Sequence, residues 1–126
     1  MNRAVLKQLK ALQPGDLVKV EWFDASTGKS LAAGADVDLP VKSFGIYVAI
    51  LGRKNKHFVL AHNCFEFSNG LYDVDYTSIP LTWTLNITVK AKQELSSGEA
   101  VLLLKSFLAG RSRRIKRRTR NHADMD

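Results

Sequence analysis

Hydrophobic and polar residues alternate along two neighbouring segments in the middle of the chain, and this pattern predicts a β-hairpin. Residues 43–67 read SFGIYVAILGRKNKHFVLAHNCFEF. Side chains two positions apart share one face of a strand, so each segment has a set that should face the core. The predicted core-facing residues are Phe44, Ile46, Val48 and Ile50 on the first strand and Phe58, Leu60, His62 and Cys64 on the second. Two such apolar strands are typical of the centre of a sheet.

Shorter periodic segments flank this hairpin. Apolar residues at helical spacing predict a short helix over residues 2–12, which Pro14 and Gly15 end. Period-two alternation predicts three further strands, over residues 16–24, 72–76 and 84–89. A long loop is expected over residues 25–42, and a turn at Ser68, Asn69 and Gly70. With a second helix after the last strand, this order predicts a mainly β fold with two helices, built around a small, bent five-stranded barrel.

The period changes near the C-terminus, where the second helix and a basic tail are expected. Ser96 and Glu99 have the spacing of a capping box, and Gly110 is typical of a helix end. The apolar stripe between them consists of Ala100, Val101, Leu103, Leu104, Phe107 and Leu108. The expected organisation is a barrel domain over residues 1–95, a docking helix over 96–110 and an Arg-rich tail over 111–126.

Positive charge is concentrated in that tail. The chain of 126 residues has 19 Lys and Arg against 12 Asp and Glu, a formal net charge of +7. The tail holds seven basic and two acidic residues, so it supplies most of this excess. Its cations are Arg111, Arg113, Arg114, Lys116, Arg117, Arg118 and Arg120.

A dense Arg run predicts binding to nucleic acid. Each phosphate that pairs with a cation releases a condensed counterion, which gives an affinity that is independent of sequence and sensitive to salt. The guanidinium group also holds phosphate through two hydrogen bonds and stacks on unpaired bases, which favours RNA before DNA as the partner. Other roles for such a run are a solubility tail, a nuclear-localisation address or attraction to anionic lipid.

The turn of the central hairpin is a second basic element. Its candidate contacts with nucleic acid are Arg53, Lys54, Lys56 and His57. A rigid hairpin would hold them at its tip, although a solvated basic turn is the alternative. Phe23, Tyr47 and Phe65 lie outside the predicted core-facing sets and are candidates for stacking on bases, whereas such residues more commonly pack beneath a helix.

Catalytic and metal-binding patterns are weak. Cys64 is the only cysteine, which excludes an internal disulfide and leaves a thiolate zinc site without its ligands. His62 and Cys64 are expected to line the core rather than to form a catalytic pair. The carboxylate pairs at residues 36 and 38 and at residues 73 and 75 lack a third clustered ligand, so solvated charges are expected. The sequence therefore predicts no enzymatic activity, no cofactor and no metal.

Membrane and export signals are also weak. No apolar run approaches the roughly 20 residues that span a bilayer. The N-terminus lacks a secretory signal, and the single cysteine suits a reducing compartment. These features predict a soluble protein with no membrane partner, cytoplasmic or, in a eukaryote, nuclear.

The order of elements resembles the Sm-like family of small barrels. The resembling parts are the helix over residues 2–12, the strand opening Pro14, Gly15, Asp16, Leu17 and Val18, and Ile79, Pro80 and Leu81 leading into Leu85, Ile87 and Val89. Over residues 2–90 the resemblance implies a helix before a bent sheet, subunits joined edge to edge in rings, and RNA binding. Residues 52–57 and 68–70 lack the family's Asp and Asn pair and its Arg and Gly pair, so no base pocket is carried over. Src-homology and Tudor-like barrels, which also suit ribosomal proteins, are similar to the same degree.

Two functional hypotheses follow from these patterns. The first is a non-enzymatic nucleic-acid-binding protein, a component of a ribonucleoprotein particle of ribosomal or Sm-like type. The second is an assembly module, in which the barrel binds a protein partner or a second copy of itself. In that case the basic tail is only an address or a solubility element.

Overall fold

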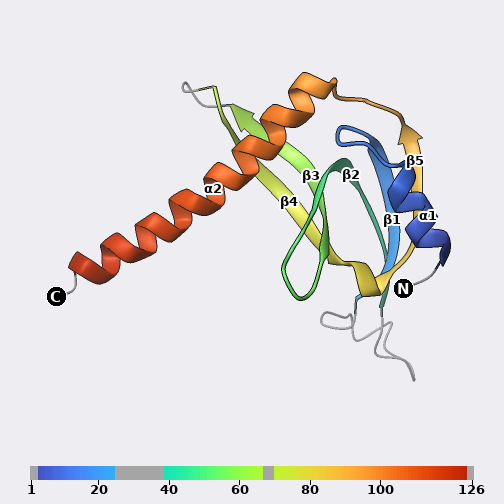
Figure 1. Ribbon diagram of the computed structural model, residues 1–126, viewed down its shortest axis with the longest axis horizontal. Coiled ribbons are helices and arrows are strands. Elements are labelled where there is room, and N and C mark those ends of the chain that lie inside the picture. Colours follow the sequence, from blue (N-terminus) through green and yellow to red (C-terminus); the bar gives the residue numbers. More distant parts are fainter. Residues whose placement is uncertain (1–2, 25–38, 67–69, 125–126) are drawn as a thin grey trace.

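The described part of the chain forms one sheet, with an α-helix before it and another after it (Figure 1). The computed structural model describes residues 3–24, 39–66 and 70–124, and of these residues 111–124 by their backbone alone. The elements are α1 (Arg3–Ala11), β1 (Leu17–Asp24), β2 (Leu39–Leu51), β3 (His57–Glu66), β4 (Tyr72–Pro80), η2 (Leu81–Trp83), β5 (Thr84–Ala91) and α2 (Ser97–Asp124). The predicted mainly β class with two helices is confirmed.

The five strands pair antiparallel in the order β4-β3-β2-β1-β5. Among the described strands, β4 and β5 are the two edges, so this is an open sheet rather than a closed barrel. The loop expected over residues 25–42 ends earlier than predicted, because Leu39 already pairs with Asp24. Residues 25–38 of that loop, with its two Asp residues, and residues 67–69 around the predicted turn lie outside the described residues.

The larger core lies on the face of the sheet that α1 covers. Alternation along β1 buries Val18, Val20 and Trp22, as predicted. The rest of this core is Val5 on α1, Phe58 and Leu60 on β3, Ile79 on β4, Leu81 in η2 and Ile87 on β5. Full burial of each large apolar side chain contributes about 1.5 to 3 kcal/mol to folding. The first helix therefore docks on the sheet through Val5, Leu9 and Leu12, whereas Leu6 of the same stripe is 41% exposed.

A smaller core lies on the opposite face, beneath α2. Leu103 and Phe107 on the helix pack against Val48, Val59 and Ala61 on β2 and β3. Both faces of the central hairpin therefore contribute to a core, Phe58 and Leu60 to the larger one and Val48, Val59 and Ala61 to the smaller one. This explains why its two strands are almost continuously apolar.

The helix α2 begins as predicted but ends later. The Ser96 Oγ accepts a hydrogen bond from the N–H of Glu99 at 3.2 Å, and Glu99 Oε1 accepts one from the N–H of Ser96 at 3.3 Å, which confirms the capping box. The predicted end at Gly110 is wrong, because the helical backbone continues to Asp124. A helical glycine costs only about 1 kcal/mol, and the Arg and Lys residues that follow are good helix formers.

An irregular pairing changes which residues of β2 face each core. The register of β2 on β3 shifts by one residue between Tyr47 and Ala49. Such a bulge exchanges the two faces of a strand. Ile46 and Val48 therefore face α2, whereas Ile50 faces the core under α1. The prediction that these residues share one face is wrong at Ile50.

A second shift, in the pairing of β3 with β4, occurs at His62. The Nε2 atom of His62 lies 2.6 Å from Oγ1 of Thr77, and Cys64 lies two residues further along the strand. Both His62 and Cys64 are exposed. The expectation that they line the core is wrong, since this end of the hairpin extends beyond both cores.

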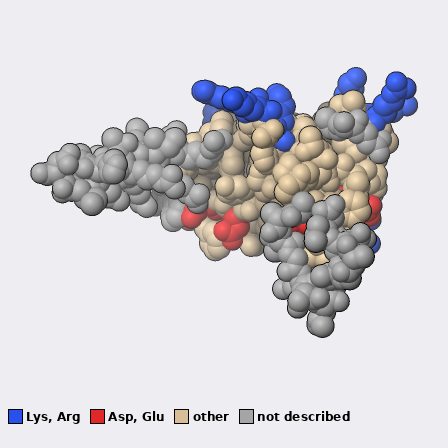
Figure 2. Space-filling view, turned by 90° about the horizontal axis from the view of Figure 1, so that it is seen from below, with Lys and Arg blue, Asp and Glu red and all other residues tan. Residues whose placement is uncertain are grey.

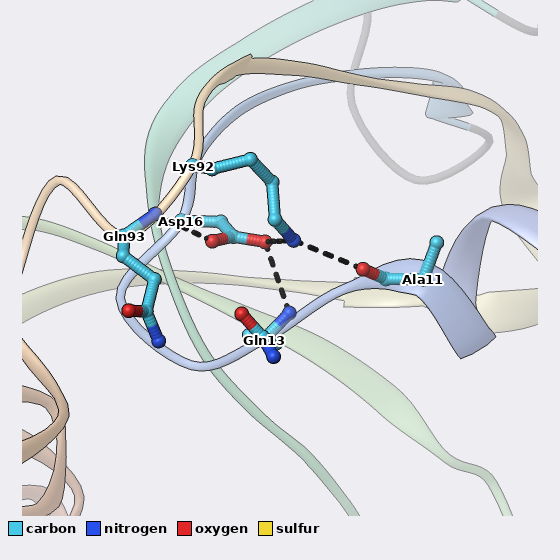
Figure 3. Close-up of polar contacts among 5 residues, drawn as sticks. All are labelled: Ala11, Gln13, Asp16, Lys92 and Gln93. Atoms are coloured by element: carbon cyan, nitrogen blue, oxygen red, sulfur yellow. Dashed lines mark hydrogen bonds and ion pairs between the residues drawn. The ribbon is translucent and has the colours of Figure 1, made fainter.

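Asp16 joins α1, β1 and the connection between β5 and α2 (Figure 3). Its carboxylate is fully buried and accepts hydrogen bonds from the N–H of Gln93 at 2.8 Å, the N–H of Gln13 at 2.9 Å and the ammonium of Lys92 at 2.6 Å. The same ammonium also donates to the carbonyl oxygen of Ala11 at 3.0 Å. Burial works to raise the pKa of this carboxyl, but the hydrogen bonds from Gln93, Lys92 and Gln13 outweigh it and hold the pKa below its ordinary value of 3.8.

Each edge of the sheet is capped at one backbone N–H by a helix side chain. On β5, the N–H of Ile87 donates to Oε1 of Gln8 at 2.9 Å, and Nε2 of Gln8 donates to Oδ1 of Asn86 at 2.7 Å. On β4, the N–H of Tyr72 donates to Oγ of Ser106 on α2 at 3.0 Å. Open edge donors invite pairing with another chain, so these caps oppose such pairing at both edges.

The substitution Gln8→Ala should destabilise the fold by about 1 kcal/mol, because the N–H of Ile87 loses its acceptor. Hydrogen exchange at the Ile87 amide should become faster, and the urea midpoint should fall. Lys7→Ala is the matched control, since Lys7 is an exposed neighbour on the same helix. Unchanged protection of the Ile87 amide in the Gln8 variant would contradict the assigned cap.

Candidate nucleic-acid interface

The turn between β2 and β3 carries three of the predicted cations, and its backbone is held in place. The exposed cations are Arg53, Lys54 and Lys56. The chain reverses at Gly52 with φ of +125°, and a Cβ atom there would collide with the carbonyl oxygen of Asn55. The N–H of Leu81 donates to the carbonyl oxygen of Lys56 at 3.0 Å, which ties the turn to η2. The cations therefore lie at a defined place on the molecule.

His57, the fourth predicted residue of this turn, differs from the three cations. It is half-buried at the start of β3, and its Nδ1 atom lies 3.0 Å from the carbonyl oxygen of Asn55. Its ring is thus engaged within the turn. The geometry favours a role in shaping the turn over direct contact with a ligand.

Charge is distributed unevenly over the described surface. Figure 2 shows most of the visible Lys and Arg side chains along one side of the molecule and Asp and Glu side chains along the other. One basic group lies where Figure 1 places the β2–β3 turn, and the other lies at the end that carries α1 and β5. The exposed cations of α1 are Arg3, Lys7 and Lys10. A polyanion would be attracted to this basic side.

The Arg-rich segment belongs to α2 and is not a separate tail. Its predicted contacts are Arg111, Arg113, Arg114, Lys116, Arg117, Arg118 and Arg120, whose side chains lie outside the described residues. Their backbone is helical, and Figure 1 shows this half of α2 projecting beyond the sheet. A helix rises 1.5 Å per residue, so the ten-residue run covers about 15 Å of its axis.

The aromatic candidates differ in exposure. Phe23 and Phe65 are 40% and 56% exposed, so neither packs beneath a helix. Tyr47 is not available for stacking on bases, because its ring stacks on Phe58 with centroids 4.8 Å apart in the core under α1. Its burial raises the pKa of the hydroxyl. Tyr47 therefore has the commoner of the two placements considered for it, packing beneath a helix.

The exposure of Phe44 was not predicted from the sequence. This residue was predicted to face the core but is 55% exposed, because the residues of α2 that cover this face begin their contacts further along β2. Phe44 pairs with Lys19 on β1. The single-sequence pattern contains no signal for this pairing, since residues 19 and 44 belong to different segments.

Features of enzymes and metal sites are sparse in the residues that the structure describes. No group of three His, Cys, Asp or Glu side chains there is arranged to hold a metal ion. Partial burial and the nearby charge of Asp75 raise the pKa of the Cys64 thiol, which disfavours the reactive thiolate. In the described part of the chain, neither helix is long and apolar enough to cross a membrane.

No family model, curated protein or solved structure matches this chain.

Proposed function

We propose that the protein binds single-stranded nucleic acid, RNA before DNA, as a non-enzymatic component of a ribonucleoprotein particle. The observation that carries this proposal is the run of seven cations within residues 111–120, of which six are Arg. Arg pairs with phosphate through two parallel hydrogen bonds and stacks on exposed bases. The run therefore supplies most of the affinity, and it does so without reading sequence.

The β2–β3 turn supports the proposal as a second contact. Its cations are exposed, and the turn is fixed by Gly52 and by the hydrogen bond from Leu81 to Lys56. Because the backbone of the turn is held in place, its cations extend from a fixed position on the protein, and the turn would orient the bound nucleic acid while the Arg-rich run supplies affinity. Selectivity for the shape of the nucleic acid is thus expected to depend on Arg53, Lys54 and Lys56.

Binding of a fluorescently labelled single-stranded RNA, measured by anisotropy at increasing salt concentrations, tests the proposal. If about five cations contact phosphates, the slope of log K against log salt should be roughly −3 to −4. A matched DNA strand should bind more weakly. An affinity for RNA that is undetectable at low salt would overturn the proposal.

The alternative function is that of an assembly module. The observation in its favour is that Val101 and Leu108 on α2 are 53% and 42% exposed, which leaves part of the helix apolar and uncovered. Exposed apolar residues of this kind are found at contacts between proteins. The sheet-edge caps at Ile87 and Tyr72 favour contact through such a face over strand pairing.

Deleting residues 111–126 separates the two functions. Under the leading proposal, the shortened chain should lose most of its RNA affinity while its sedimentation coefficient reports an unchanged oligomeric state. Under the alternative, association would persist in the shortened chain and the intact chain would bind RNA no better than the shortened one. Circular dichroism of both chains provides the control for folding.

A further inference from the structure

The uncovered part of the sheet face opposite α1 carries aromatic and basic side chains side by side. Val18, Val20 and Trp22 point into the core under α1, so the intervening residues of β1 point to the opposite face. Residues that pair directly across antiparallel strands share a face. The pairs on this face are Lys19 with Phe44, Glu21 with Lys42 and Phe23 with Pro40.

We propose that this surface, defined by Phe44, Lys42, Lys19 and Phe23, is a stacking platform for unpaired bases of the bound nucleic acid. The proposal rests on the proposed function and assigns the bases a site distinct from the Arg-rich helix. Phe44 and Phe23 are 55% and 40% exposed, so each ring is accessible to a ligand. Flat aromatic rings bind bases of any identity, because every base has a π-face.

The spacing of the platform suits a strand of nucleic acid. Same-face residues two apart on a strand are separated by about 7 Å, so the two aromatic rings lie about 14 Å apart along the strands. This is too far for one base to contact both rings, and each ring therefore takes a base of its own. Lys42 lies at the intermediate position, where it would meet the phosphates between those bases.

The charges on the platform favour a polyanion as its occupant. Lys42 is exposed and makes no ion pair within the described part of the chain. The one carboxylate of the platform, Glu21, pairs with Lys19 at 3.3 Å, so these two charges compensate each other and Lys42 supplies the platform's net positive charge. A cation next to an exposed aromatic ring is the combination that single-strand binding surfaces use.

Phe65 shows the contrast that makes this assignment specific. It is 56% exposed, nearly the same as Phe44, but it pairs with Asp73 on β4. A phosphate there would meet a negative charge. Exposure alone does not distinguish the two rings, whereas the charge of the neighbour across the strand does.

The test compares Phe44→Ala and Phe44→Leu with Phe65→Ala in the full chain, using a labelled oligouridylate of about 12 nucleotides, within the site sizes of single-strand binders. Both Phe44 variants should bind about tenfold more weakly than the unmodified protein, whereas Phe65→Ala should bind equally well. Phe44→Leu retains apolar bulk without a flat ring, so it separates loss of stacking from loss of folding. Ultraviolet crosslinking to the same RNA should label the peptide that contains Phe44.

Three outcomes would overturn the platform. Unchanged RNA affinity in both Phe44 variants, with the unmodified protein binding normally, would reject the platform and leave the proposed function standing. A change in sedimentation without a change in RNA affinity would assign this face to a protein contact instead. Absence of RNA binding by the unmodified protein would reject both proposals together.

Discussion

A chain in which Arg113, Arg114, Arg117 and Arg118 are replaced by Ala should bind single-stranded RNA about two to three orders of magnitude more weakly at about 0.1 M salt. Each phosphate contact contributes about 0.7 to the slope of log K against log salt for single strands. Four lost contacts therefore reduce the slope by about 3, and the loss is largest at low salt. Anisotropy titrations at several salt concentrations measure both quantities.

The matched control replaces the same four Arg residues by Lys. This variant keeps every charge, so its salt slope should equal that of the unmodified protein. Its affinity should be lower at all salt concentrations, because Lys lacks the planar group that grips phosphate bidentately and stacks on bases. Full affinity in the Ala variant would reject the Arg-rich helix as the main contact.

Asp16→Asn should destabilise the protein by about 3 kcal/mol at neutral pH, the largest effect on folding that we expect from a single change. The buried carboxylate accepts hydrogen bonds from Gln93, Gln13 and Lys92 (Figure 3). An amide supplies only one acceptor oxygen, and its NH₂ group would face donors. Urea unfolding, followed by the fluorescence of the two Trp residues, measures the loss.

The ionisation of Asp16 makes the stability of the protein depend on pH in a direction that can be predicted. The pKa of Asp16 is lower in the folded protein than its ordinary value of 3.8. Its ionised form therefore stabilises the fold fully above about pH 4, and this stabilisation is lost as the pH falls through the lowered pKa. The Asp16→Asn variant has no carboxylate to protonate at this position, so it should not show this loss. The free energies of unfolding of the variant and of the unmodified protein should therefore converge at low pH.

Asp73→Asn is the control for Asp16, because Asp73 is exposed on β4. Its removal should change the free energy of unfolding by no more than about 0.5 kcal/mol. If Asp16→Asn were as stable as this control at neutral pH, Asp16 would not be the joint between α1 and the β5–α2 connection.

Local patterns in the sequence predicted most of the architecture. The alternation of Val18, Val20 and Trp22 placed β1 correctly, and Ser96 with Glu99 marked the start of α2. These predictions succeeded because strand period and helix capping depend on residues that are close in the chain. The open edges of the sheet could not be predicted in this way, since closure depends on the pairing of distant strands.

Predictions about individual side chains failed where pairing between distant segments intervened. Phe44 and Ile50 were predicted to face one core together with Ile46 and Val48, whereas Phe44 is exposed and Ile50 lies in the core under α1. The bulge between Tyr47 and Ala49 moves Ile50 to the other face, and Phe44 extends beyond the part of the face that α2 covers. The alternation of residues 43–51 predicts neither the bulge nor the limit of the surface that α2 covers.

The sequence by itself determined the mainly β class, the two helices and the concentration of Arg in residues 111–120. These properties follow from local periodicity and from composition, which folding does not alter. Only the tertiary structure decided that Asp16 is a buried joint, that Gln8 and Ser106 cap the sheet edges, and that Phe44 lies beside Lys19. Each of these features brings together residues far apart in the chain, so it depends on strand register and helix docking.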